Sequence, residues 1–279
     1  MTVITLLHPG SMGAAIGAQA TAAGHRVLWV PNGRSQETRR RAQAAGLTAA
    51  SSLRAALDAS TIVVSVCPPD AADQISSDVN QLGFTGLYLD ANAISPQRVC
   101  RLADGMTAHV LDGAIIGPPP GGRKTARLYV SGNPKAVGQI QGLFEGTAVE
   151  VREAGHDLGS ASALKMAFAS FQKSARTLAA VAHALADTHG VSDLLTEEAK
   201  RMPSAILSDP DYLPSVAARA WRWRDEMEDI AATLRAAELP THIADATAAV
   251  LNLWEDDKDK QGLPVREVLA RLRTEHPTG

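Results

Sequence analysis

The sequence lacks several features that mark particular classes of protein. Its 279 residues include two cysteines, Cys67 and Cys100, which form neither a disulfide framework nor a metal-binding pair. No apolar run approaches the ~20 residues that span a bilayer. The apolar start has no basic region before it, so we interpret it as a strand and not as a signal peptide. The net charge of −3 gives no reason to expect nucleic acid or a membrane as partner. These absences predict a cytoplasmic protein.

The composition is that of an ordinary globular protein, with 45% hydrophobic and 20% charged residues. In the first part, short β-branched runs alternate with alanine-rich helical stretches such as Ala14–Ala23 and Gln36–Ala45. The candidate strands are Val3–Leu7, Arg26–Val30, Thr61–Val66, Leu87–Asp90, His109–Asp112 and Arg127–Ser131. Helices between strands imply parallel pairing, so we expect a doubly wound Rossmann sheet.

The pattern changes near residue 155. From Gly159 to about Arg273 the helical pattern continues and no strand-like run occurs. The length also suits two domains. We therefore predict an α/β protein with a Rossmann domain over residues 1–155 and an all-α domain over residues 156–279.

A glycine turn follows the first strand and precedes a helix. Such a turn directs backbone N–H groups and the positive end of the helix at a phosphate. We predict that Gly10, Ser11, Met12 and Gly13 bind the pyrophosphate of a dinucleotide. The first glycine of the usual GxGxxG pattern is replaced by His8, which we interpret as a tolerated turn residue.

The end of the second strand indicates which dinucleotide is bound. An NAD-binding domain has a carboxylate there that accepts hydrogen bonds from the ribose, whereas this chain has none. Arg34 can pair with the 2′-phosphate of NADP, and Asn32 and Ser35 can donate hydrogen bonds to it. NADP(H) is the predicted cofactor.

Loops that follow the later strands of an open α/β sheet also contact ligands. We expect Cys67 and Pro68 to lie beside the cofactor and Asn92 to hold the nicotinamide ribose or the substrate. Gly117 and Pro118 begin a rigid loop that we expect to form one wall of the substrate pocket.

Several segments together resemble a known group of enzymes. The glycine loop and the Asn32–Ser35 segment are similar to the β-hydroxyacid dehydrogenase and 6-phosphogluconate dehydrogenase superfamily. More specific are the segments Asp90–Pro96, Asp112–Pro119, Gly159–Met166 and Trp221–Ile230, which resemble a branch with its own C-terminal helical domain. The likeness covers roughly residues 2 to 255.

The resemblance implies a long helix leading from the Rossmann domain into the helical domain, and a homodimer with intertwined helical domains. It also implies NAD(P)-dependent hydride transfer to a small-molecule substrate at the domain interface. A lysine on the long helix then acts as acid or base, and Lys165 matches it, six residues after Gly159. Ser162 shares a helix side with Lys165 and is assigned to the substrate pocket.

Trp221 and Trp223 are two residues apart on one predicted helix and therefore face different directions. We expect one to pack in the core and the other to line the substrate pocket. No metal is predicted, because the histidines have no metal-ligand spacing. These are His156, His183, His189 and His242.

The chain departs from better-known members at positions that contact substrate. Ala169 replaces an asparagine four residues after the lysine, Asn92-Ala93 replaces a Ser/Thr pair, and Ile116-Gly117-Pro118 replaces a Ser-Gly-Gly carboxylate site. The leading hypothesis is interconversion of a small hydroxy and keto substrate with NADPH. Imine reduction and a non-catalytic NADPH-binding role stay open as alternatives.

Overall fold

The computed structural model describes residues 1–68, 71–169, 189–199, 201–202, 213–221, 223–224, 227, 235 and 238–272. The chain divides into two compact units, Met1–Ala169 and Ser170–Gly279.

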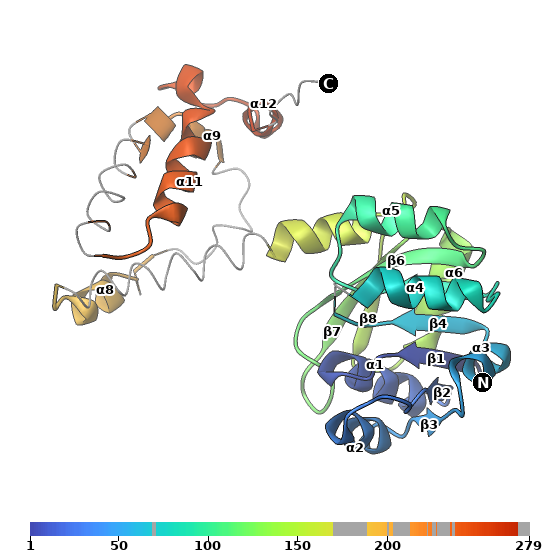
Figure 1. The fold of residues 1–279 in the computed structure, drawn as a ribbon. Coiled ribbons are helices and arrows are strands. Elements are labelled where there is room, and N and C mark those ends of the chain that lie inside the picture. The colour runs from blue at the N-terminus through green and yellow to red at the C-terminus, as the bar shows by residue number, and fades with distance from the viewer. Residues whose placement is uncertain are drawn as a thin grey trace. The chain divides into compact units, whose positions relative to one another are not determined.

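The first unit is built on an eight-stranded sheet in the order β3-β2-β1-β4-β5-β6-β7-β8 (Figure 1). The strands are β1 (Val3–Leu7), β2 (Arg26–Trp29), β3 (Thr48–Ala49), β4 (Ile62–Ser65), β5 (Leu87–Asp90), β6 (His109–Ile116), β7 (Ala126–Ser131) and β8 (Val149–Gly155). The order from β3 to β6 is that of a Rossmann domain, and these six strands are parallel. The predicted fold class is therefore confirmed.

One strand pair differs from the predicted parallel sheet. β6 continues past Asp112 to Ile116, and β7 pairs with it antiparallel. The connection over residues 117–125 holds no helix, and without a crossover the chain can return only antiparallel. Gly121 and Lys124 exchange backbone hydrogen bonds of 2.9 and 3.0 Å, which close the hairpin.

Two strands were not predicted. β3 has only two residues, too few to give a periodic signal. β8 alternates Val149 and Val151 with exposed Glu150 and Arg152, as expected of a sheet-edge strand that is covered on one face.

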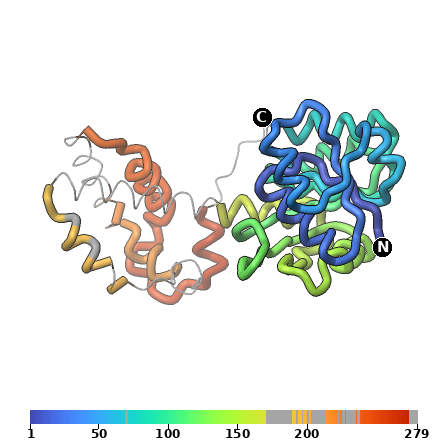
Figure 2. Tube along the Cα trace, turned by 90° about the horizontal axis from the view of Figure 1, so that it is seen from below, coloured from blue at the N-terminus to red at the C-terminus, as the bar shows by residue number. Residues whose placement is uncertain are grey.

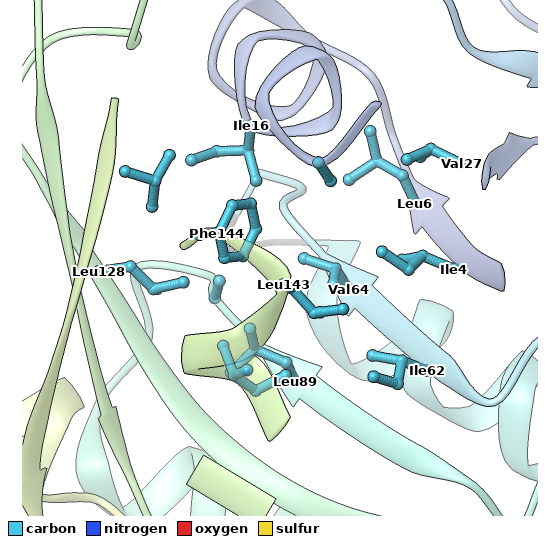
Figure 3. Close-up of a cluster of buried hydrophobic side chains, with 14 of the residues drawn as sticks. Ile4, Leu6, Ile16, Val27, Ile62, Val64, Leu89, Leu128, Leu143 and Phe144 are labelled. Atoms are coloured by element: carbon cyan, nitrogen blue, oxygen red, sulfur yellow. The ribbon is translucent and has the colours of Figure 1, made fainter. Parts of the chain in front are cut away.

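Helices cover both faces of the sheet. They are α1 (Ser11–Ala22), α2 (Gln36–Ala44), α3 (Leu53–Ala59), α4 (Ala72–Gln81), α5 (Pro96–Asp104) and α6 (Pro134–Leu143). On one face, Ile62 and Val64 of β4 pack with Ile16 of α1 and with the end of α6 (Figure 3). On the other face, Val63 packs with residues of α3, α4 and α5. Burial on both faces explains why β4 is apolar at nearly every position.

After β8, residues 160–169 are helical. They form the described beginning of the predicted interdomain helix, and the rest of that prediction lies outside the described residues.

In the second unit, the described residues form helices and no strand. The coiled course of the trace in these helices can be followed in Figure 2. The helices are α8 (Ser192–Ala199), α9 (Leu213–Ala217), α11 (His242–Asn252), the short 3₁₀ helix η3 (Glu255–Asp257) and α12 (Val265–Ala270). Trp254 and Val268 belong to the core of this unit, and the indole N–H of Trp254 donates to the Val268 carbonyl oxygen at 2.9 Å. Among the described residues, no helix is both long and apolar enough to cross a membrane.

Candidate cofactor and active site

The loops after β1 and β2 form a cavity of about 310 Å³ at the carboxyl edge of the sheet. Three residues from the predicted nucleotide region, His8, Asn32 and Arg34, line it. The other lining residues are Leu6, Leu7, Val30, Ser51, Ser52, Leu53, Ile75 and Asp78. A larger cavity of about 790 Å³ lies at the opposite edge, among residues that precede the strands, where an open α/β sheet does not place its ligand.

The glycine turn has the geometry of a phosphate-binding loop. Gly10 is the N-cap of α1 and gives no side-chain cap, and the first turn of α1 contains no acidic residue. A Cβ at Gly13 would lie 2.6 Å from the carbonyl oxygen of His8, so only glycine lets α1 approach the loop this closely. Ser11 is exposed, whereas Met12 packs against the sheet core. The first-turn N–H groups are left for an anionic ligand.

Arg34 is half-buried in the loop after β2. One of its terminal nitrogens lies 2.9 Å from Nδ1 of His8, and no carboxylate of the described residues forms an ion pair with it. Asn32 is exposed beside it. Ser35 is the N-cap of α2, and its hydroxyl oxygen accepts a hydrogen bond of 3.2 Å from Thr38 N–H.

These features fit a nicotinamide dinucleotide. The uncapped first turn of α1 would hold the pyrophosphate, and the guanidinium of Arg34 would face a 2′-phosphate at the cavity.

Next to the glycine turn after β1, four buried polar residues form a row across the sheet. Ser65, Asp90, Asp112 and Ser131 are register partners on β4, β5, β6 and β7, and each is at most 1% exposed. We call these four residues the polar row. Sequence reasoning missed it as a unit, although Asp90 and Asp112 each begin one of the family-like segments. The signal available was that both acids come at equivalent points of neighbouring predicted strands.

The first half of the polar row fixes the loops after β4 and β5. The side-chain oxygen of Asn92 accepts a hydrogen bond of 2.6 Å from Cys67 N–H. Its amide nitrogen donates to Ser65 at 3.1 Å and to Asp90 at 2.9 Å. Asn92 is 3% exposed. These hydrogen bonds join the two loops, and both amide hydrogens of Asn92 are donated to Ser65 and Asp90. Cys67 is buried, whereas Pro68 is exposed.

Burial raises the pKa of Asp90 to about 6. The hydrogen bonds from Asn92 oppose this effect, and the neighbouring charge of Asp112 adds to it. A carboxyl group with such a pKa changes its charge near neutral pH.

The second half of the polar row anchors the helix that carries Lys165. Asp112 accepts hydrogen bonds from Ser162 N–H at 2.8 Å and from the Ser162 hydroxyl at 2.6 Å. Ser131 adds a bond of 3.2 Å to Asp112 and accepts one of 3.1 Å from Ala161 N–H. Ser162 is 1% exposed, so it holds the helix to β6 and does not present a free hydroxyl to a pocket.

Lys165 lies one helical turn beyond Ser162 on the same helix side. Its ammonium group donates a hydrogen bond of 2.6 Å to the carbonyl oxygen of Ile115, the next-to-last residue of β6. Gly117 and Pro118 are the first two residues after β6, and both are exposed. Lys165 and the predicted pocket wall are thus brought together at the carboxyl end of β6.

Trp221 and Trp223 belong to the second unit. The ammonium of Lys258 lies 4.0 Å from the ring centre of Trp221. The guanidinium of Arg219 lies 5.0 Å from that of Trp223, which packs against the core of this unit. Of the two tryptophans, Trp223 therefore takes the predicted packing role. The described residues contain no group of three or more potential metal ligands.

Solved structures that resemble the chain over almost its whole length include reductases. An imine reductase from a Pseudomonas species has 18% identity and a TM-score of 0.72, with 98% of this chain and 99% of that chain covered. A reductive aminase from Aspergillus terreus, in complex with NADPH and ethyl levulinate, has 19% identity and a TM-score of 0.74, with 98% and 100% covered. A conserved protein of unknown function, structurally similar to 3-hydroxyacid dehydrogenases, has 23% identity and a TM-score of 0.58, with 91% and 97% covered.

No curated protein sequence matches the chain. Residues 186–254 match a domain family of unknown function. Residues 4–155, more than half of the chain, match the family described as the NAD binding domain of 6-phosphogluconate dehydrogenase. The chain therefore belongs to this family, and it is an NAD(P)-dependent oxidoreductase.

Proposed function

We propose that the protein uses NADPH to reduce the carbonyl group of a small substrate, with Lys165 as the proton donor. The observation that carries the cofactor preference is Arg34, which lines the nucleotide cavity and has no carboxylate partner among the described residues. A dinucleotide with a 2′-phosphate gives this guanidinium its counter-charge, whereas NADH does not. Gly10, Ser11, Met12 and Gly13 serve the pyrophosphate, and Asn32 and Ser35 the ribose phosphate.

The proposed role of Lys165 follows from its position. Its ammonium group is held at the carboxyl end of β6, where ligands of an open α/β sheet bind. Bound NADPH supplies the hydride that the carbonyl carbon accepts. Lys165 gives a proton to the carbonyl oxygen as negative charge develops there, so that the product is an alcohol. Gly117 and Pro118 then form the pocket wall, while Asn92 and Ser162 position the loops and the helix.

Replacing Lys165 by methionine tests this role. We expect Lys165→Met to lower the rate of NADPH oxidation with a substrate carbonyl by about 10²–10⁴-fold, the usual contribution of a general acid. NADPH affinity, measured by fluorescence titration, should stay within about twofold, because Lys165 does not line the nucleotide cavity. Lys135→Met, at an exposed lysine of α6, is the matched control. Full activity of Lys165→Met would refute the assignment.

A second candidate is reduction of a carbon–nitrogen double bond. Ile116-Gly117-Pro118, at the end of β6 and the start of the hairpin, replaces the Ser-Gly-Gly site that could bind a carboxylate. The whole-length likeness to an imine reductase and a reductive aminase also favours it. NADPH oxidation with cyclic imines, or with a ketone only when an amine is added, would select this chemistry. Tight NADPH binding without turnover of either class would favour a non-catalytic role.

We also propose a cytoplasmic homodimer, with residues 156–279 as the substrate and dimerisation domain and Trp221 in the substrate pocket. The sequence has two cysteines and no dense disulfide framework, which suits a reducing compartment. Leu194 and Met202 of the second unit are more than half exposed, which suits an interface with a second copy. Light scattering that gives the mass of a single 29.3 kDa chain would exclude the dimer.

A further inference from the structure

His8 has an unusual backbone conformation for its residue type. Its φ is +65°, in the left-handed region that glycine adopts freely and that other residues adopt only at a cost. The residue stands where the phosphate-binding pattern has its first glycine, so the loop keeps the glycine-like backbone while it carries an imidazole. The ring lies over the turn, because a Cβ at Gly10 would be 3.6 Å from its Cδ2 atom.

The imidazole has a defined partner. Nδ1 of His8 lies 2.9 Å from a terminal nitrogen of Arg34. A guanidinium only donates hydrogen bonds, so Nδ1 must be the acceptor, and the proton of the neutral ring must be on Nε2. Burial and the charge of Arg34 both lower the pKa of His8, which favours this neutral form. Apart from His8, the ionisable residues that line the cavity are Arg34 and Asp78.

This bond holds a long, flexible side chain at one place. A guanidinium has five N–H donors, and the bond to His8 uses one of them. The Arg34 side chain makes no other hydrogen bond with the described residues, so its remaining donors can meet a ligand at the cavity beside Asn32. A side chain that is already ordered loses less conformational entropy when the ligand binds, so the fixed Arg34 binds a 2′-phosphate more tightly than a mobile one would.

We propose that His8 is a positioning residue that sets the preference for NADPH over NADH by holding Arg34 in place. The inference rests on the proposed function, specifically on Arg34 as the contact of the 2′-phosphate. It goes beyond that function because His8 discriminates between the two cofactors without itself meeting the phosphate.

Two substitutions separate the acceptor atom from the shape of the loop. His8→Gly removes the ring and suits the positive φ, so the loop keeps its conformation. His8→Asn also tolerates this region, and its side-chain oxygen occupies nearly the same place relative to Cβ as Nδ1 of histidine. His8→Asn therefore retains the acceptor for Arg34, and His8→Gly does not.

The experiment measures dissociation constants of NADPH and NADH by quenching of tryptophan fluorescence, for the wild type, His8→Gly, His8→Asn, Arg34→Ala and the double variant His8→Gly/Arg34→Ala. We expect His8→Gly to weaken NADPH binding by about tenfold, the loss of roughly one hydrogen bond. NADH binding should change less than about twofold, and His8→Asn should stay within about threefold of the wild type for both cofactors. In the Arg34→Ala background, His8→Gly should have no further effect, because the residue through which His8 acts is gone.

Four results would overturn the inference. Equal weakening of NADPH and NADH would mean that His8 only shapes the loop. An undiminished effect of His8→Gly in the Arg34→Ala background would mean that His8 acts independently of Arg34. Equal affinity of the wild type for both cofactors would leave no preference for His8 to set. If the wild type binds neither nucleotide, the proposed function itself fails. If the wild type prefers NADPH and His8→Gly has the same preference, only this inference fails.

Discussion

Asp90 makes a prediction about stability that depends on pH. The carboxyl group is 1% exposed at the end of β5, and burial raises its pKa from 3.8 to about 6. The groups that face it are Asn92, which donates two hydrogen bonds, and the charges of Asp112 and Arg98. The folded protein therefore keeps a proton on Asp90 at pH values where the unfolded chain has already lost it.

The sign and size follow from this difference. Because the folded-state pKa is the higher one, the stabilising contribution is fully present below about pH 3.8 and is lost as the pH rises through about 6. At about 1.4 kcal/mol per pKa unit, the full difference is about 3 kcal/mol. Between pH 4.5 and 7.5, the wild type should lose about 2 kcal/mol of unfolding free energy through this group.

Asp90→Asn removes the titration and keeps one acceptor for Asn92. Urea unfolding of the full chain at pH 4.5, 6.0 and 7.5, followed by circular dichroism, measures the effect. The loss between pH 4.5 and 7.5 should be smaller in Asp90→Asn than in the wild type by about 2 kcal/mol. Asp104→Asn, at an exposed aspartate that ends α5, is the control and should keep the wild-type pH dependence. Equal pH dependence of the wild type and Asp90→Asn would refute the reasoning.

Two further substitutions probe the loop and the helix anchor. Gly13→Ala places a Cβ 2.6 Å from the His8 carbonyl oxygen, so α1 must move. We expect this substitution to lower the unfolding free energy by about 1–3 kcal/mol and to weaken the binding of NADPH and NADH alike. The control Gly138→Ala has open space around the added Cβ and should cause neither effect. Asp112→Ala removes both acceptors of Ser162 and leaves its buried N–H and hydroxyl without them; we expect a loss of about 2–3 kcal/mol and faster hydrogen exchange over residues 160–169. Unchanged exchange there would mean that Asp112 does not anchor the helix.

The sequence predicts the parallel part of the sheet well, because β1, β4 and β5 are short apolar runs bounded by turns or helices. It fails at β6 and β7 for a physical reason. The pattern of Arg127–Ser131 gives the strand but not its direction, which depends on whether the connection before it holds a helix. Residues 117–125 are rich in glycine and proline, and that composition could have indicated a hairpin.

The site predictions divide in the same way. Backbone-determined features, such as the need for glycine at position 13, follow from a local pattern. Partners that lie far apart in the sequence do not, since nothing near Ser162 indicates that its hydroxyl binds Asp112, 50 residues away. The sequence indicates only a turn residue at His8, because the contact of His8 with Arg34 arises only when β1 and β2 lie side by side.

The place of Lys165 follows from two attachments between one strand and one helix. Ser162 binds Asp112, and Lys165 binds the carbonyl oxygen of Ile115, so two residues three apart on the helix attach to two residues three apart on β6. Residues three apart share a helix face, whereas the two attachment points on the strand differ in kind, a side chain and a backbone oxygen. The first bond fixes the rotation of the helix, and that rotation directs Lys165 to the end of β6. The segments that begin at Asp112 and at Gly159 therefore depend on each other structurally. A substitution in the first segment should displace Lys165 in the second.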